Sequence, residues 1–179
     1  MVQPVVGSIA VTYRDASWTH NLDAWLIQVG TRSRFNHAAI VSHIENYDKI
    51  TVIEAAGGGV RERVLTDEEL PRWRFESWHW ITLPQRQAIT TEARKQIGVP
   101  YDYLDILKFV RRFWTGKVEG HTRDYSDGKL ICSELVSWCL HKAGINPWPK
   151  IAFGAVSPGD IAEWIFDVEN TLDSVSVPR

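Results

Sequence analysis

The stretch FNHAAIVSHIENYDKITVIEAAGGGVRERVL, residues 35–65, decides the fold class of this chain. It contains three runs of mostly apolar or β-branched residues, and each run has the length of a strand: 35–44, 49–56 and 60–65. The segment 45–48 has the composition of a turn, so the second run returns beside the first. The glycines at 57–59 end that second run. Strands joined by such short turns pair antiparallel, and we therefore expect an antiparallel sheet.

Patterns on both sides of this stretch add helices to the sheet. Further strands are predicted at residues 6–13 and 72–83. Apolar residues at helical spacing predict helices at 17–30, 85–98, 104–114 and 131–144, and residues 161–168 predict a short helix or strand. The polar, glycine-rich segment 116–129 is predicted to be a long loop. Because strands cluster instead of alternating with helices, the predicted fold class is α+β.

Length and composition indicate one folded domain. The 179 residues fit a single domain, 1–179, with a core at about 6–165 and a polar C-terminal tail. Apolar residues make up 44%, and the net charge is −2 without a run of Lys and Arg, which argues against nucleic-acid or anionic-membrane partners. The N-terminus lacks the pattern of an export signal, and no apolar run is long enough to span a bilayer. We therefore expect a cytoplasmic protein without stable membrane insertion. The sequence does not indicate an oligomeric state.

Two cysteines, Cys132 and Cys139, lie on the helix predicted at 131–144. Seven residues of helix separate them by roughly 10 Å, too far for a disulfide, so both are predicted to be free thiols. Cys132 lies in the first turn, where the partial positive charge of the helix favours a thiolate, the form that attacks acyl groups. The alternative is that Cys132 only fills the core. Cys139 lacks the field of the helix end and is predicted to be a core residue.

A thiolate nucleophile needs a base, and His37 is the best placed histidine. It lies among small apolar residues, so it is either a base or a core histidine with its hydrogen bonds satisfied. Glu54, in the apolar run TVIEAAG, is the candidate to orient it. If the hairpin turns at 45–48, Ile44 faces Lys49 and Ala39 faces Glu54, which places His37 and Glu54 on one face of the sheet. The alternative for Glu54 is an ion pair with a nearby arginine.

Other chemistries lack a motif in this sequence. There is no His-Glu-x-x-His, Cys-x-x-Cys, Gly-x-Ser-x-Gly or Gly-x-Gly-x-x-Gly pattern, and no pair of carboxylates suggests a glycosidase. His37 and His43 would be roughly 20 Å apart along a strand, too far to share a metal. We therefore expect neither a metal nor an organic cofactor.

The order of the segments VGSIAVT, FNHAAIVSH, VIEAAGGGV, GVPYDY and ICSELVSWCLHKAGI resembles that of the circularly permuted NlpC/P60 enzymes. These papain-like proteins include the YiiX-like amidases and, more distantly, the lecithin:retinol acyltransferases. The resemblance covers residues 6 to 165 approximately. It implies a permuted papain-like fold in which the histidine strand precedes the cysteine helix.

The resemblance also implies a role for each matching residue. Cys132 matches the nucleophile, His37 the general base and Glu54 the polar residue that orients it. Tyr101 matches a tyrosine beside the thiol, which would bind the oxyanion together with the backbone N–H of Cys132; packing at a helix start is the alternative. The chain departs from the family in having Gly7-Ser8 where Gly-Asp is usual, and in the loop at 116–129, which matches nothing in the family.

The activity implied is that of a cysteine-dependent hydrolase, a thiol amidase or peptidase that forms a thioester acyl-enzyme. Its expected substrates are peptide-like or acyl-amide compounds, such as cell-wall peptides, isopeptides or N-acyl amino compounds. One alternative is a lipid acyltransferase or thioesterase that uses the same Cys-His site, which a groove lined by Trp78, Trp80 or Trp114 would favour. Another is a catalytically idle domain that only binds a partner.

Overall fold

A computed structural model describes residues 3–13, 33–46, 49–76, 80–102, 128–151 and 155–175, with only the backbone described at 46 and 167–175. The helices predicted at 17–30 and 104–114, and nearly all of the loop predicted at 116–129, lie outside these ranges.

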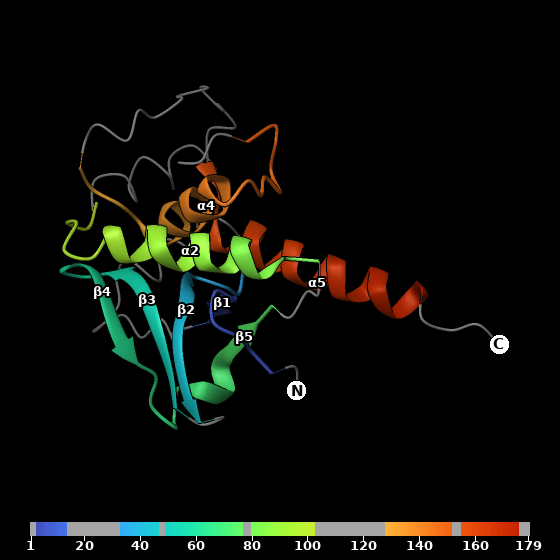
Figure 1. Cartoon of the computed structure of the whole chain (residues 1–179), viewed down its shortest axis with the longest axis horizontal. Helices are drawn as coiled ribbons and strands as arrows, with labels where there is room; N and C mark the ends of the chain where they lie inside the picture. Colours follow the sequence, from blue (N-terminus) through green and yellow to red (C-terminus); the bar gives the residue numbers. More distant parts are fainter. Residues whose placement is uncertain are drawn as a thin grey trace.

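A five-stranded antiparallel sheet forms the body of the molecule (Figure 1). Its strands, in spatial order, are β4 (Gly59–Val64), β3 (Lys49–Ala56), β2 (His37–Asn46), β1 (Ile9–Thr12) and β5 (Trp73–Phe75). The predicted antiparallel sheet and the α+β class are thus confirmed. The three strands of the stretch 35–65 are consecutive neighbours, as expected from their short connections.

Three helices and a short 3₁₀ turn complete the described structure: α2 (Leu83–Lys95), α4 (Cys132–Lys142), α5 (Pro158–Val175) and η1 (Leu70–Arg72). Figure 1 shows α2 crossing the sheet, and α4 contacts both α2 and the central strands β2 and β3. Helix α5 packs on α4 and on β1 and β2 near its start, and its later turns extend to the side of the molecule (Figure 1).

Two predicted boundaries are wrong. Of the segment 72–83 that was expected to be one strand, Trp73–Phe75 form β5, whereas residues 80–82 are irregular and α2 begins at Leu83. The cause is a helix start: Thr82 N–H donates to Gln85 Oε1 at 3.0 Å, and Pro84 occupies the first turn. The short helix or strand predicted at 161–168 is a longer helix, because α5 runs from Pro158 to Val175.

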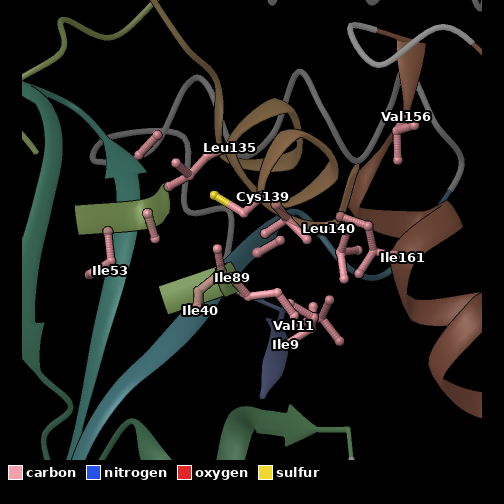
Figure 2. Packing of buried hydrophobic residues seen from close by; sticks show 14 of the residues in the cluster. Ile9, Val11, Ile40, Ile53, Ile89, Leu135, Cys139, Leu140, Val156 and Ile161 are labelled. Carbon is pink, nitrogen blue, oxygen red and sulfur yellow. The ribbon is translucent and has the colours of Figure 1, made fainter. Parts of the chain in front are cut away.

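The sheet buries apolar side chains on both faces. The helix-side cluster joins one face to the helices, and Figure 2 shows part of it; its members include Ile9, Val11, Ala38, Ile40, Ile53, Ala55, Ile89, Leu135, Val136, Cys139, Leu140 and Ile161. The far-side cluster occupies the other face and consists of Ala10, Ala39, Val41, Ile50, Val52, Leu65 and Trp73. Successive residues of β2 alternate between the two clusters, as the pleat of a strand requires.

The hairpin of β2 and β3 does not follow one register. Ile40 is paired with Ile53, as predicted, but Ile44 is paired with Ile50 instead of Lys49, and Asn46 is paired with Lys49. Two irregularities in β2, one between Val41 and His43 and one between Ile44 and Asn46, account for the difference. Each shift moves the register by one residue, so two shifts together restore the side on which each residue points. Away from the turn, at Ile40 and Ile53, the pairing is therefore the predicted one.

Candidate active site

His37 and Glu54 form a buried pair at one end of the sheet. His37 Nε2 lies 2.7 Å from Glu54 Oε2, and the two residues are 5% and 0% exposed. The Ile40–Ile53 register places Ala39 opposite Glu54, so the pair meets diagonally across β2 and β3, as the sequence predicted. An ionised carboxylate only accepts hydrogen bonds, so Nε2 carries the proton and the lone pair of the neutral ring is on Nδ1.

Two arginines of β4 bind the other oxygen of the same carboxylate. Glu54 Oε1 accepts Arg61 Nε at 3.1 Å and Nη2 at 2.9 Å, and it accepts Arg63 Nε at 2.7 Å. The ion pair that sequence analysis offered as an alternative to a His37 contact is therefore present together with that contact. Burial alone would raise the pKa of Glu54, but the hydrogen bonds and charges of His37 and Arg63 hold that pKa well below its ordinary range.

The face on which this pair lies differs from the face that carries the helices. His37 has the same facing as Ala39 and Val41 of the far-side cluster, and its ring meets Trp73 edge-on, with centroids 5.8 Å apart. Trp73 itself belongs to the far-side cluster. His37 and Glu54 are thus held at the end of the sheet, on the side opposite the helix-side cluster.

Cys132 is the first residue of α4, as predicted. The start of this helix is capped by its own third residue, because Ile131 N–H donates to Glu134 Oε2 at 3.1 Å. Cys132 is 1% exposed and belongs to neither apolar cluster, whereas Cys139 is a member of the helix-side cluster. Both thiols are thus buried and free of disulfides, and the core role that sequence analysis allowed for Cys132 stays open beside the nucleophile role.

Backbone hydrogen bonds connect the start of α4 to the end of the sheet that carries His37 and Glu54. At this end β2 begins, β3 ends and β4 begins. Val60 N–H, at the second residue of β4, donates to Val99 O at 2.8 Å. Leu130 N–H then donates to Pro100 O at 3.1 Å, two residues before Cys132. The start of β2, the end of β3 and the segment that leads into α4 thus lie at the same end of the sheet.

Tyr101 lies within this connection. It forms an isolated parallel bridge with Leu130, is 7% exposed and belongs to the helix-side cluster. The packing role that sequence analysis allowed for Tyr101 is therefore present. The bridge also sets Tyr101 beside the segment that leads directly into Cys132.

Gly7 and Ser8, the departure from the family pattern, have packing roles. A Cβ atom on Gly7 would lie 2.7 Å from the Cβ of Arg86, so only glycine fits there without a shift. Ser8 Oγ accepts the N–H of Val5 at 3.0 Å.

Arg61, Arg63 and Glu69 belong to the site although no motif in the sequence singles them out. Arg63 also binds Glu69, with Nη1–Oε2 at 2.7 Å and Nη2–Oε1 at 3.0 Å. The alternation Arg-Glu-Arg at 61–63 was an available signal, because it places both arginines on one face of the strand, next to the Glu54 strand. Glu69 follows β4 in an irregular segment, and no sequence pattern indicated its position.

The described ranges contain no group of three His, Cys, Asp or Glu side chains suited to a metal ion. None of the helices in these ranges is both long and apolar enough to cross a bilayer. A scan of protein-family models finds no match to this chain, and a search of curated proteins finds no significant relative.

Proposed function

We propose that this chain is a thiol hydrolase that cleaves an amide bond, with Cys132 as nucleophile and His37 as base. The observation that carries the proposal is the buried His37–Glu54 pair, 2.7 Å apart, at the end of the sheet to which the segment before α4 is linked through residues 99 and 100. The sequence resemblance to the circularly permuted NlpC/P60 enzymes supports it, because the same residues match that family's nucleophile, base and orienting residue.

The proposed reaction assigns a task to each nitrogen of His37. Nε2–H donates to Glu54, so Nδ1 would take the thiol proton as the sulfur of Cys132 attacks the acyl carbon. The side chains of His37 and Cys132 come from opposite faces of the sheet, so the proposal requires them to meet at its end. The backbone N–H of Cys132 and the hydroxyl of Tyr101 would stabilise the oxyanion. The C–N bond then breaks, the imidazolium gives its proton to the leaving amine, and a thioester remains. Water, deprotonated by Nδ1, hydrolyses the thioester and restores the thiol.

The test is an activity screen on muropeptides, acyl amides and acyl esters with the wild type and Cys132→Ala. We expect turnover on an amide, and a loss of at least about 10³-fold in kcat for the variant. Cys139→Ala is the matched control, because Cys139 lies in the apolar core, two turns away on the same helix. Turnover that survives Cys132→Ala in a folded protein would contradict Cys132 as the nucleophile. No turnover by the wild type on any of the three substrate classes would contradict the hydrolase and favour a binding domain.

A lipid acyltransferase or thioesterase is the second candidate, and the position of Trp80 favours it. Trp80 is 45% exposed and meets Trp164 edge-on at 6.2 Å, and Trp164 in turn meets Trp148 at 5.4 Å. Such an aromatic surface suits an acyl chain. Faster turnover of long-chain acyl esters than of peptide amides, with a loss in Trp80→Ala for the long chains alone, would select this candidate.

A further inference from the structure

We infer that Arg63 is a positioning residue, which acts through Glu54 to fix the tautomer and the orientation of His37. The catalytic consequence of this inference rests on the proposed function. The contacts that place Arg63 do not depend on it.

The guanidinium of Arg63 is held between two carboxylates. Its Nε donates to Glu54 Oε1 at 2.7 Å, while Nη1 and Nη2 donate to the two oxygens of Glu69 at 2.7 and 3.0 Å. The side chain is 20% exposed, so these bonds are only partly screened by water. A planar guanidinium that serves two acceptors has little freedom to rotate. Arg63 therefore fixes Glu54 mainly through Oε1. Its contact with Oε2, from Nη2 at 3.5 Å, is long, and the short bond to that oxygen comes from His37 at 2.7 Å.

Glu69 is itself held by hydrogen bonds, so the contacts around His37 form one connected network. Its Oε2 accepts Thr66 N–H at 3.0 Å and Thr66 Oγ1 at 3.2 Å, in the turn that precedes η1. The 3₁₀ turn leads into Trp73, whose ring meets the imidazole of His37 edge-on. Residues on both sides of the imidazole are thus linked to each other through Glu69 and Arg63.

Arg61 provides an internal comparison. It binds the same oxygen of Glu54 through Nε and Nη2, but its side chain is 52% exposed. In the part of the chain that the structure describes, it forms no ion pair with a second carboxylate. Arg61 therefore contributes charge with a looser geometry, whereas Arg63 contributes both charge and orientation.

The charges near His37 determine the direction of the expected effect. The charged groups come from three places: Glu54 faces His37 from β3, Arg61 and Arg63 lie next to Glu54 on β4, and Glu69 follows β4. The neighbours of His37 from β1 and β5 are Thr12 and Trp73, which are uncharged. The start of α4 adds the thiol of Cys132 at this end of the sheet. Loss of Arg63 removes a positive charge and a donor to Glu54, so protonation of His37 becomes easier.

The experiment follows the imidazole directly, by two-dimensional ¹H–¹⁵N spectroscopy of the histidine side chains across pH. In the wild type we expect neutral His37 to be protonated at Nε2. In Arg63→Gln we expect the His37 midpoint to rise by about one pH unit and the tautomers to mix. Arg61→Gln should shift the midpoint by less than half as much. Arg74→Gln, the same charge change at an exposed residue of β5, should leave it unchanged.

An unmoved His37 midpoint in Arg63→Gln, or a shift no larger than that of Arg61→Gln, would overturn the inference. If Arg63→Gln does not fold, Arg63→Lys replaces it, because lysine keeps the positive charge but lacks the planar set of guanidinium donors. In Arg63→Lys the His37 midpoint should stay at its wild-type value, while the two tautomers mix. The two hypotheses fail separately. Turnover by Cys132→Ala would contradict the proposed cysteine mechanism and would not affect the His37 spectra. An Arg63→Gln spectrum in which the His37 signals do not change would contradict the positioning role of Arg63 alone.

Discussion

At the scale of the residue, Glu54 organises the candidate site. A fully buried carboxylate is costly unless its charge is compensated, and here donors from His37, Arg61 and Arg63 occupy both oxygens. The carboxylate is thereby ionised and immobile. A histidine that donates to such an acceptor has a fixed ring and a defined basic nitrogen.

Glu54→Gln should therefore destabilise the protein. The substitution removes the negative charge while Arg61, Arg63 and His37 stay next to it, and the partial exposure of the arginines moderates the cost to about 2–4 kcal/mol. Urea unfolding at pH 7 measures the free energy of unfolding. The control is Glu62→Gln on β4. The side chain of Glu62 is 38% exposed and its carboxylate lies as far as 4.0 Å from Arg94, so the substitution should cost about 0.5 kcal/mol or less. Equal losses in the two variants would contradict the special role of Glu54.

The stabilisation by Glu54 should also depend on pH. Because the folded-state pKa of Glu54 lies below the unfolded value of about 4.3, its contribution is complete above that pH and is lost as the pH falls toward the folded pKa. The difference in unfolding free energy between wild type and Glu54→Gln should hence shrink as the pH falls from about 5 toward 3, below the ordinary range of histidine titration. A difference that grows between about pH 5 and pH 3 would show that Glu54 is not the depressed group.

At the scale of the element, two register shifts in β2 preserve the facing of His37 and Glu54. One shift alone would turn Glu54 to the face opposite His37, because neighbouring residues of a strand point to opposite sides. The first shift occurs at Ser42, whose Oγ donates to Thr51 O at 3.2 Å and whose carbonyl accepts Arg94 Nη2 at 3.2 Å. Helix α2 thus helps to hold the irregular part of the strand.

The turn between β3 and β4 offers a matched pair of glycines. Gly59 has a φ of +120°, and a Cβ there would lie 2.6 Å from Val99 O; Gly58 has a φ of +104° with open space around it. Gly59→Ala should cost about 2 kcal/mol more than Gly58→Ala, because it adds a backbone clash to a similar φ strain. Differential scanning calorimetry of the two variants measures this. Equal costs would mean that the contact between this turn and residue 99 is not tight.

The antiparallel strands were predictable from sequence because each has its own apolar pattern and a short turn to the next. The facing of His37 and Glu54 was predictable for the same reason, although the pairing of Ile44 was not, since nothing in residues 42–46 distinguishes a bulge from a regular strand. The strand predicted at 72–83 failed because alternation continues past Phe75 while a helix start at Thr82 takes precedence. Glu69 was not found because its partner lies six residues away across a turn.

At the scale of the whole molecule, the sheet separates two apolar clusters, and Cys139 lies deep in the helix-side cluster (Figure 2). Burial, together with the charge of Glu92, raises the pKa of the Cys139 thiol well above its ordinary value. A thiol that is both buried and protonated does not react with alkylating agents in the native state. Its reactivity therefore reports the opening of the core.

In a Cys132→Ala background, alkylation of Cys139 should follow global unfolding. We expect iodoacetamide to modify it at least about 10³-fold more slowly in the native protein than in urea, because labelling requires the core to open. Mass spectrometry of timed samples measures the rate, and added denaturant should accelerate it in proportion to the unfolding equilibrium. Rapid labelling without denaturant would show that α4 detaches locally from the sheet.

The bridge between Tyr101 and Leu130 has a consequence for how the cysteine helix is held. Leu130 is bonded to Pro100 and to Asp102, so the two ends of the segment 103–127 are joined to each other before the chain reaches Cys132. The residues that form this bridge are independent of the length of the segment they enclose. The start of the cysteine helix is therefore anchored by residues 100–102, wherever the intervening chain runs.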